Sequence, residues 1–487
     1  MSMKMRFIGM VVAFSTLLGA APLFATASTD SLHLSLRDVL LKAAQNNPLF
    51  RIERIDTEVA STIYRENLYR YEPQIRMSFG SSQQRGDSVR NVQNASVAVT
   101  EELPTGTSIQ LEGSVGPLSG GGLRPFTVPG EEYENSMSLT LAQPLMRGLS
   151  PSANLAPIRT ANVDICIRQE ELAAYAMKLL ADTERAYWDL VLSRREVGIY
   201  THSLELARRL LYESEEKLKV GRIASLDLAV IRAEVATREK QLIDASAAFR
   251  QKSLQLIYLM SDSLLWETQL APKDTAVSLD HADSVVLHLK AAQAHRPDLS
   301  LARLLARKGE LEVTRTKNGL LPKLDFFITL EGSSYAQSFS DALSRYDEPS
   351  GSISGGLTFQ MPASNGASRE RHRRAVLSSE QIELSLENFS RLMELEVRSA
   401  HLEASRALKQ IEAAQVARDL QQKKLEAEQE KMNVGKSTEY AVLQAQRDYI
   451  SADLDEARAR VTYMNALLSL YSSDGTLLNR RGIAAYQ

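Results

Sequence analysis

The stretch that decides the fold is residues 367–434, ASRERHRRAVLSSEQIELSLENFSRLMELEVRSAHLEASRALKQIEAAQVARDLQQKKLEAEQEKMNV. It contains neither glycine nor proline, so nothing interrupts a helix on the order of 100 Å long. Apolar or small residues recur along one face at steps of three or four, which is typical of long coiled-coil packing. This seam comprises Ile382, Leu386, Phe389, Met393, Val397, Ala400, Ala404, Ala407, Ile411 and Ala414. Such a helix needs partners of matching length to bury its seam.

The N-terminus predicts export. Residues 1–27 have the pattern of a secretory signal peptide: Lys4 and Arg6 are basic, 7–18 is apolar, and 25–27 reads Ala-Thr-Ala. No later segment approaches 18 uninterrupted apolar residues, so a mature chain that crosses a membrane must do so with strands. The single cysteine, Cys166, excludes an intramolecular disulfide. A net charge of −3 provides no basic excess for a nucleic-acid partner.

The two halves of the chain repeat the same order of elements. Asn47-Pro48 and Arg296-Pro297 each precede a helix, and a Val-Gly-basic triplet follows each long helix, at residues 220–222 and 434–436. We therefore expect a signal peptide (1–27), a first repeat (28–260), a linker (261–296), a second repeat (297–475) and a tail (476–487). The expected helices are 48–72, 156–220 and 225–260 in the first repeat, and 297–321, 367–434 and 438–473 in the second.

Six segments alternate between apolar and polar residues, the pattern of strands whose two faces meet different surroundings. They are 73–83, 95–103, 107–116 and 135–143 in the first repeat, and 323–332 and 352–361 in the second. Two interpretations are open: a lipid-embedded, water-filled barrel, or an ordinary sheet with one face on a protein core. Predicted export and the long helices favour the barrel. The strands of one chain are too few to close a wide barrel, so several copies must close it.

Three stretches resemble the TolC family of outer-membrane efflux and secretion channels: Leu36–Pro48 (LRDVLLKAAQNNP), Leu139–Gly148 (LTLAQPLMRG) and Val434–Gln446 (VGKSTEYAVLQAQ). Together with the repeat, the resemblance extends over residues 35–475. It implies a mainly α fold with β: very long antiparallel helices forming an α-barrel, and strands contributing to a trimeric transmembrane β-barrel. It also implies a location in the outer membrane with a periplasmic extension.

The resemblance also implies the partners. They are two further copies in a homotrimer, outer-membrane lipid, a periplasmic adaptor (membrane fusion) protein, and an inner-membrane pump of RND or ABC type. The family's usual strand number gives twelve per trimer, whereas the six segments here give eighteen. The extra hairpin in the first half either joins the barrel or forms a flap outside it.

The turns at the ends of the long helices are the candidate site. We expect Val220, Gly221, Arg222, Val434, Gly435 and Lys436 to form an adaptor-docking surface; the alternative is that they only cap helices. Members of the family carry acidic residues six and nine positions after the second glycine, which here are Ala441 and Gln444. Asp227 and Glu439 are the nearest carboxylates. These four are the candidate pore constriction, and an aspartate gate is not expected.

The sequence indicates no enzyme, cofactor or metal site. Gly435-Lys436-Ser437 lacks the earlier glycine of a phosphate-binding loop, because Glu430 stands there. The histidines show no ligand spacing. A basic run, residues 369–374, follows the last strand and could contact lipid headgroups or form ion pairs between helices. The predicted function is a passive exit duct of a tripartite efflux or type I secretion system. The alternative is a periplasmic coiled-coil adaptor or spacer that never enters the outer membrane.

Overall fold

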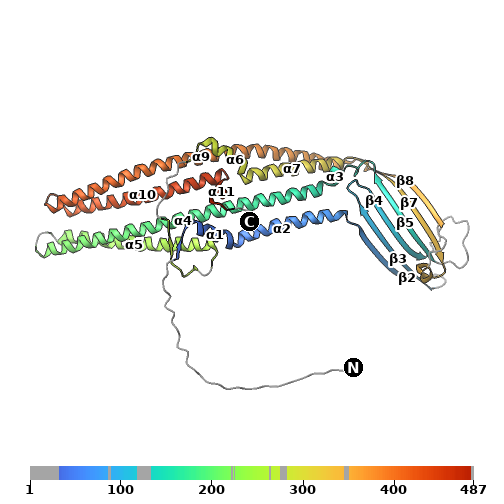
Figure 1. The fold of residues 1–487 in the computed structure, drawn as a ribbon, viewed down its shortest axis with the longest axis horizontal. Coiled ribbons are helices and arrows are strands. Elements are labelled where there is room, and N and C mark those ends of the chain that lie inside the picture. The colour runs from blue at the N-terminus through green and yellow to red at the C-terminus, as the bar shows by residue number, and fades with distance from the viewer. Residues whose placement is uncertain are drawn as a thin grey trace, which may run out of the picture.

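The structure is a computed structural model that describes residues 32–85, 89–117, 133–220, 223, 225–262, 265–274, 282–344 and 350–483. The signal peptide expected at 1–27 lies outside these residues. The molecule is a long rod of helices with one antiparallel sheet at one end, and two helical hairpins form the opposite end (Figure 1). The mainly α fold with a strand domain is therefore confirmed.

The two halves contain matching elements. The first half has β1 (Leu32–Leu34), α1 (Leu36–Asn46), α2 (Pro48–Leu68), the 3-10 turn η1 (Tyr69–Tyr71), β2 (Gln74–Arg85), β3 (Val89–Glu102), β4 (Ser108–Pro117), β5 (Tyr133–Pro144), α3 (Pro151–Asn154), α4 (Ala156–Lys219) and α5 (Ser225–Met260). The second half has β6 (Leu270–Pro272), α6 (Val285–His295), α7 (Pro297–Asn318), β7 (Lys323–Ala336), α8 (Phe339–Ser344), β8 (Ser350–Gln360), α9 (Gly366–Asn433), α10 (Glu439–Ser473) and α11 (Leu477–Arg481).

Each very long helix packs against two shorter ones. Helix α4 contacts α2 towards the sheet and α5 towards the far end, while α9 contacts α7 and α10 in the same way. Helix α4 also contacts α7 and α10, which joins the two halves. Four helices therefore lie side by side at either level, in the order α2-α4-α7-α9 near the sheet and α5-α4-α10-α9 near the tips.

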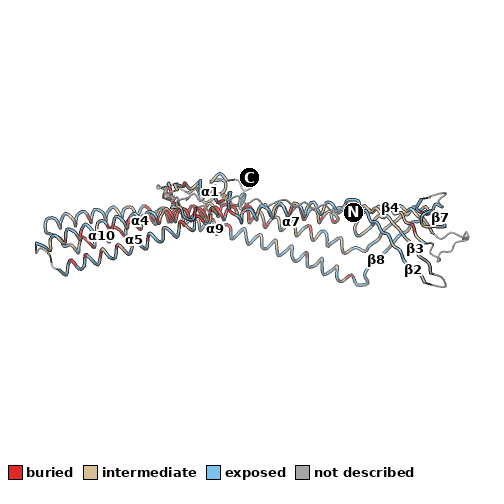
Figure 2. Tube along the Cα trace, turned by 90° about the horizontal axis from the view of Figure 1, so that it is seen from below, coloured by how far each residue is buried: buried red, intermediate tan, exposed pale blue. Residues whose placement is uncertain are grey.

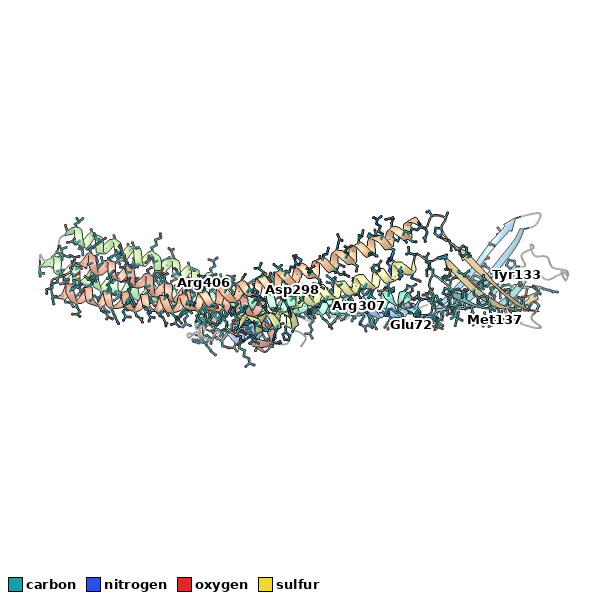
Figure 3. All side chains as sticks on the ribbon, turned by 90° about the horizontal axis from the view of Figure 1, so that it is seen from above. Glu72, Tyr133, Met137, Asp298, Arg307 and Arg406 are labelled. Atoms are coloured by element: carbon teal, nitrogen blue, oxygen red, sulfur yellow. The ribbon has the colours of Figure 1, made fainter. Side chains whose placement is uncertain are left out.

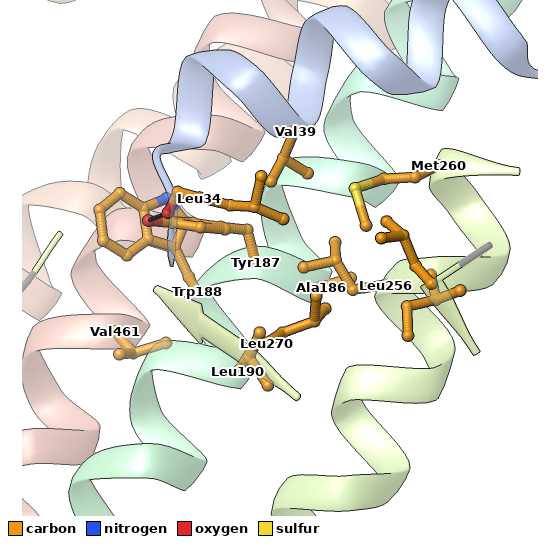
Figure 4. Close-up of a cluster of buried hydrophobic side chains, with 12 residues drawn as sticks. Leu34, Val39, Ala186, Tyr187, Trp188, Leu190, Leu256, Met260, Leu270 and Val461 are labelled. Carbon is orange, nitrogen blue, oxygen red and sulfur yellow. Dashed lines mark hydrogen bonds between the residues drawn. The ribbon is translucent and has the colours of Figure 1, made fainter. Parts of the chain in front are cut away.

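The buried residues are concentrated at mid-length, where short elements wrap the rod (Figure 2). Strands β1 and β6 pair in parallel there, and the hydroxyl of Tyr187 on α4 donates to Asp274 at 2.5 Å. Leu34, Val39, Leu256 and their neighbours pack around Tyr187 and Trp188 (Figure 4). This cluster fixes α1, α4 and α5 to one another, so both arms of the rod extend from one rigid centre.

Part of the α9 seam is buried as expected. Met393, Val397, Ala404, Ala407 and Ile411 are buried, and the last three pack against α10. The prediction that Phe389 belongs to the buried seam is wrong, since its side chain is 45% exposed. Near the sheet, α9 has only α7 beside it within the described residues, so the packing face there is narrower than the seam.

Six strands form one antiparallel sheet in the order β2-β3-β4-β5-β7-β8. The hairpin β3–β4, for which barrel and flap were both open, pairs with β2 on one side and β5 on the other. Phe327 interrupts the alternation of β7, and its ring lies over Gly356 of β8, where a Cβ would come within 3.1 Å. Figure 3 shows the sheet from a second direction, with Tyr133 and Met137 labelled on it.

No helix in the described part of the chain is both long and apolar enough to cross a membrane. The tail, which the sequence leaves unassigned, contains α11. Its Leu477 is fully buried in a cluster with Leu40, Met177 and Leu468.

Candidate functional site: the helix tips and the polar face of the sheet

The tip of the second half is a complete helix-turn-helix. Gly435 adopts φ +74°, its N–H bonds to the carbonyl of Met432, and the N–H of Lys436 bonds to the carbonyl of Lys431 at 2.7 Å. This is a Schellman motif, which confirms the left-handed cap expected there. Thr438 then caps α10 by accepting from the N–H of Ala441. The turn presents Val434, 67% exposed, at the end of the molecule.

The tip of the first half has the same composition. Helix α4 ends at Lys219, and Val220 is exposed like Val434. Gly221 and Arg222 lie outside the described residues. Leu226 at the start of α5 is also exposed. An exposed branched residue therefore stands at each of the two tips, in line with the docking surface expected from the sequence, which stays a prediction.

The candidate constriction residues do not form one cluster. Lys217 of α4 donates to Glu439 at 3.2 Å, so the charge of Glu439 joins the two hairpins. Gln444 donates to Asp448 at 2.9 Å, Ala441 belongs to the first turn of α10, and Asp227 is exposed in the first turn of α5. Their role at a constriction stays a prediction.

A buried ionic cluster above the tips escaped the sequence analysis. Glu234 of α5 is 3% exposed and pairs with Arg238 of its own helix at 2.6 Å. It also accepts from the Nε of Arg447 of α10 at 3.2 Å, which ties the two hairpins together. The internal repeat gives one sequence signal for this position. The spacing of 214 residues that relates Gly221 to Gly435 also relates Glu234 to Asp448, a second carboxylate, which pairs with Lys424 at 2.7 Å.

This cluster predicts acid sensitivity. Burial alone would raise the pKa of Glu234, but the hydrogen bond from Arg447 and the charge of Arg238 outweigh it and hold the pKa below its ordinary 4.5. A carboxylate with a depressed pKa stabilises the fold above its unfolded pKa and loses that contribution as the pH falls. We expect Glu234→Gln to melt at a lower temperature than the parent at pH 7, and the difference to close below about pH 4. A difference that persists unchanged when the pH falls well below about 4 would contradict this.

The two faces of the sheet differ sharply. One row of opposed residues reads Ile75, Val99, Leu111, Leu139, Leu330 and Ile353, one from each strand. On the other face a row consists entirely of serines: Ser78, Ser96, Ser114, Ser136, Ser333 and Ser350. Their hydroxyls pair at 2.7 Å between β2 and β3 and at 2.8 Å between β4 and β5. One face is thus apolar and the other lined with small hydroxyls.

The basic run at 369–374 begins α9 beside the sheet. The imidazole of His372 contacts the hydroxyl of Thr316 on α7 at 3.1 Å, and the four arginines are exposed. Their contact with lipid stays a prediction. Within the described residues no group of three or more His, Cys, Asp or Glu side chains is placed to hold a metal.

A sequence model of the outer membrane efflux protein family matches residues 288–476. The chain is therefore similar to this family over most of its second half. Members of the outer membrane efflux protein family are transport ducts and not enzymes. No curated protein matches the chain.

Solved outer-membrane channels have the same fold as this chain. The Campylobacter jejuni CmeC outer membrane channel is 16% identical with a TM-score of 0.67, covering 91% of this chain and 86% of that one. The Vibrio cholerae outer membrane protein VceC is 12% identical with a TM-score of 0.69, covering 90% and 96%. The open state of the Neisseria gonorrhoeae MtrE outer membrane channel is 14% identical with a TM-score of 0.65, covering 91% and 89%.

Proposed function

We propose that this protein is a trimeric outer-membrane channel that serves as the passive exit duct of a tripartite efflux or type I secretion system. The observation that carries the proposal is that one chain forms a curved wall with two unlike, unfinished edges. Strand β2 and helices α2 and α5 lie at one edge, and β8 and α9 lie at the other. Such edges are complementary to each other and not to themselves, so they favour a head-to-tail ring.

The sheet edges are suited to this closure. Within the described residues, β2 pairs only with β3 and β8 only with β7. The strands alternate in direction, so β8 of one protomer and β2 of the next would pair antiparallel like every other neighbour in the sheet. Closure would satisfy the backbone groups that an open edge leaves unpaired, which a strand in lipid requires.

The helical edges carry matching apolar stripes. On α9 the face opposite the buried seam carries a stripe of exposed apolar residues. Their spacings of 4, 7, 11 and 14 residues place them on the same side of the helix. The stripe comprises Leu377, Leu384, Leu395, Leu402, Val416 and Leu420. On α2 the exposed stripe comprises Ile52, Ile55, Val59 and Ile63. Two stripes of this kind, one on each edge, are what a neighbouring protomer would bury.

The apolar face of the sheet supports insertion in lipid. Its exposed side chains include Ile75, Met77, Phe79, Met137, Leu139, Ile353, Leu357 and Phe359. Apart from α8 at the end distant from the helices, no described element packs on this sheet beyond its own strands and the helix junction. An ordinary sheet would cover such a face with a protein core, whereas a membrane barrel turns it to hydrocarbon.

The assembly itself provides the first test. Extraction from the outer-membrane fraction into detergent should yield a stable particle of three chains. A soluble monomer or dimer in the periplasm would refute the channel and leave the coiled-coil adaptor.

Charges on the α9 stripe should prevent this assembly. Leu402 is 71% exposed in the isolated chain, and a ring would bury it. We expect Leu395→Arg combined with Leu402→Arg to abolish the trimer, because two unpaired charges would enter an apolar interface. Glu412→Arg is the matched control, since Glu412 lies on a lateral face of the same helix and is exposed. Trimers of equal yield from both variants would contradict the proposed interface.

We propose that the tips dock a periplasmic adaptor, which couples the duct to an inner-membrane pump of RND or ABC type. Docking and capping can be separated at Gly435, around which a Cβ would meet nothing within 4 Å. Asparagine tolerates φ +74° far better than valine does. If docking uses this surface, Gly435→Asn should lose export nearly as much as Gly435→Val, with trimers intact in both. Normal export by Gly435→Asn would leave capping as the only role.

A further inference from the structure

We propose that the hairpin β3–β4 widens the membrane barrel to eighteen strands, giving an exit as broad as the helical duct and lined by hydroxyls suited to large hydrated cargo. The inference rests on the proposed trimeric channel and adds the size and chemistry of its exit. Three observations carry it: the register of the hairpin, the chemistry of its two faces and the anchoring of its turn.

The hairpin is paired along most of its length. Strand β3 opposes β2 from Val89↔Arg85 to Thr100↔Gln74, and β4 opposes β5 from Pro117↔Tyr133 to Ser108↔Ala142. A flap would leave β2 and β5 adjacent, and here two full strands separate them. The hairpin is therefore an integral part of the wall.

The apolar face and the polar face of the sheet both continue across β3 and β4, because the rows of opposed residues keep the same alternation there. Val99 and Leu111 extend the apolar row, while Ser96 and Ser114 extend the serine row. A hairpin outside the membrane would be under no demand to keep hydrocarbon on one side and hydroxyls on the other. Its pattern is the one that neighbouring strands show.

The turn between β3 and β4 is fixed to the helical junction. The amide of Asn154 donates to the carbonyl of Pro104 at 3.0 Å, and the hydroxyl of Thr107 donates to the side chain of Gln143 at 2.5 Å. Gly106, at φ +83°, lies so close to Gly148 that a Cβ would come within 2.3 Å of its carbonyl oxygen. A mobile flap would not be held at three points.

The widths of the two parts agree. Six strands tilted by about 40° span about 38 Å, and four helices side by side span about 32–40 Å, whereas four strands would span only about 25 Å. Three protomers would close a barrel about 36 Å across at the backbone, against about 24 Å for twelve strands. Allowing about 5 Å of side chain on each side leaves a bore of about 26 Å instead of about 14 Å.

The lining determines which cargo this bore would favour. The row next to the serine row mixes Arg76, Glu112 and Glu331 with small residues. The row beyond it consists of Gln74, Thr100, Gln110, Thr140, Thr329 and Ser354. Hydroxyls and amides replace water contacts without offering apolar patches that would retain cargo. The exit is therefore better suited to hydrated solutes than to hydrophobic ones.

Cysteine accessibility tests membership of the hairpin. In a Cys166→Ser background, single cysteines replace neighbouring residues in pairs: Ser96 and Val97 on β3, Gln110 and Leu111 on β4, and Ser138 and Leu139 on β5 as the reference. Trimers in lipid vesicles are treated with a charged thiol reagent. We expect the cysteines at positions 96, 110 and 138 to react with the reagent and the cysteines at positions 97, 111 and 139 not to react. If β5 alternates but both members of a β3 or β4 pair react, the inference fails alone; if β5 fails to alternate, the proposed channel fails with it.

Polymer exclusion tests the bore. Neutral polyethylene glycols of increasing size are added to the extracellular side of single channels in a bilayer. We expect polymers up to about 13 Å in radius to partition into the parent channel and lower its conductance. Removal of Val89–Pro117 would bring β2 beside β5. Because Ser78 and Ser136 lie in the same row, the polar and apolar faces of the sheet would stay continuous. This deletion should lower the largest polymer radius that enters the channel to about 7 Å. A parent limit of about 7 Å would overturn the inference, whether or not the deletion variant assembles.

Discussion

Gly475→Ala should strongly destabilise this protein, although the substitution adds only one methyl group. Gly475 ends α10 at φ +74°, and a Cβ there would lie 2.7 Å from the carbonyl oxygen of His295 and 2.9 Å from the N–H nitrogen of Arg296. Both neighbours are backbone atoms at the end of α6, so they cannot rotate away. We expect a loss on the order of 4 kcal/mol in the free energy of unfolding, at the upper end of single-substitution effects.

Gly482→Ala provides the control for this experiment. Gly482 also has positive φ, +66°, but a Cβ there would meet nothing within 4 Å. It should lose only about 1 kcal/mol, the strain of the left-handed backbone. Thermal melting of the two purified variants separates strain from collision. Equal melting temperatures would show that the contact between Gly475 and His295 is not tight.

The steric clash at Gly475 matters because this residue lies beside a buried cluster of hydrogen-bonded polar side chains. His288 Nδ1 and Asp474 Oδ2 are 2.6 Å apart with both side chains buried, and Asp474 also accepts from the N–H and hydroxyl of Thr476. The Nε2 of His288 has no hydrogen-bond partner among the described residues. The end of α10, the linker helix α6 and the start of the tail are thus joined at one point, and a displaced Gly475 would disturb all three.

Sequence periodicity was sufficient for the long elements. Helix α9 follows from 68 residues without a breaker, and α4 follows from its repeat partner. The alternation of β2 to β8 follows from the different surroundings of their faces, which sequence records directly. Phe389 escaped because a periodic pattern states which face is apolar and not how much of that face a neighbour covers. Its exposure depends on tertiary contacts.

The hairpin and the ionic cluster show a second limit of sequence reasoning. Alternation in β3 and β4 is the same for a barrel strand and for a flap, so pairing partners had to decide between them. Glu234 and Arg447 lie 213 residues apart, and each looks like one more charge on a solvated helix. Only the packing of α10 beside α4 and α5 buries that carboxylate and makes it a link between hairpins.

Arg481→Ala tests whether the tail is a structural part of the rod. Glu184 on α4 is fully buried, and the guanidinium of Arg481 on α11 binds it through Nε at 2.8 Å and through a second nitrogen. The indole N–H of Trp188 supplies one further donor at 3.3 Å. Removing the arginine leaves a buried carboxylate without its cation, so we expect a loss of about 3 kcal/mol in the free energy of unfolding.

The double variant Glu184→Gln with Arg481→Ala decides the cause. A neutral glutamine can still accept from Trp188 and carries no charge that needs a partner, so most of the lost stability should return. If the double variant melts as low as Arg481→Ala alone, the packing of α11, not the charge, holds the tail. Because Leu477 of the same helix is fully buried against Leu40 and Leu468, both contributions act at one place, and the double variant separates them.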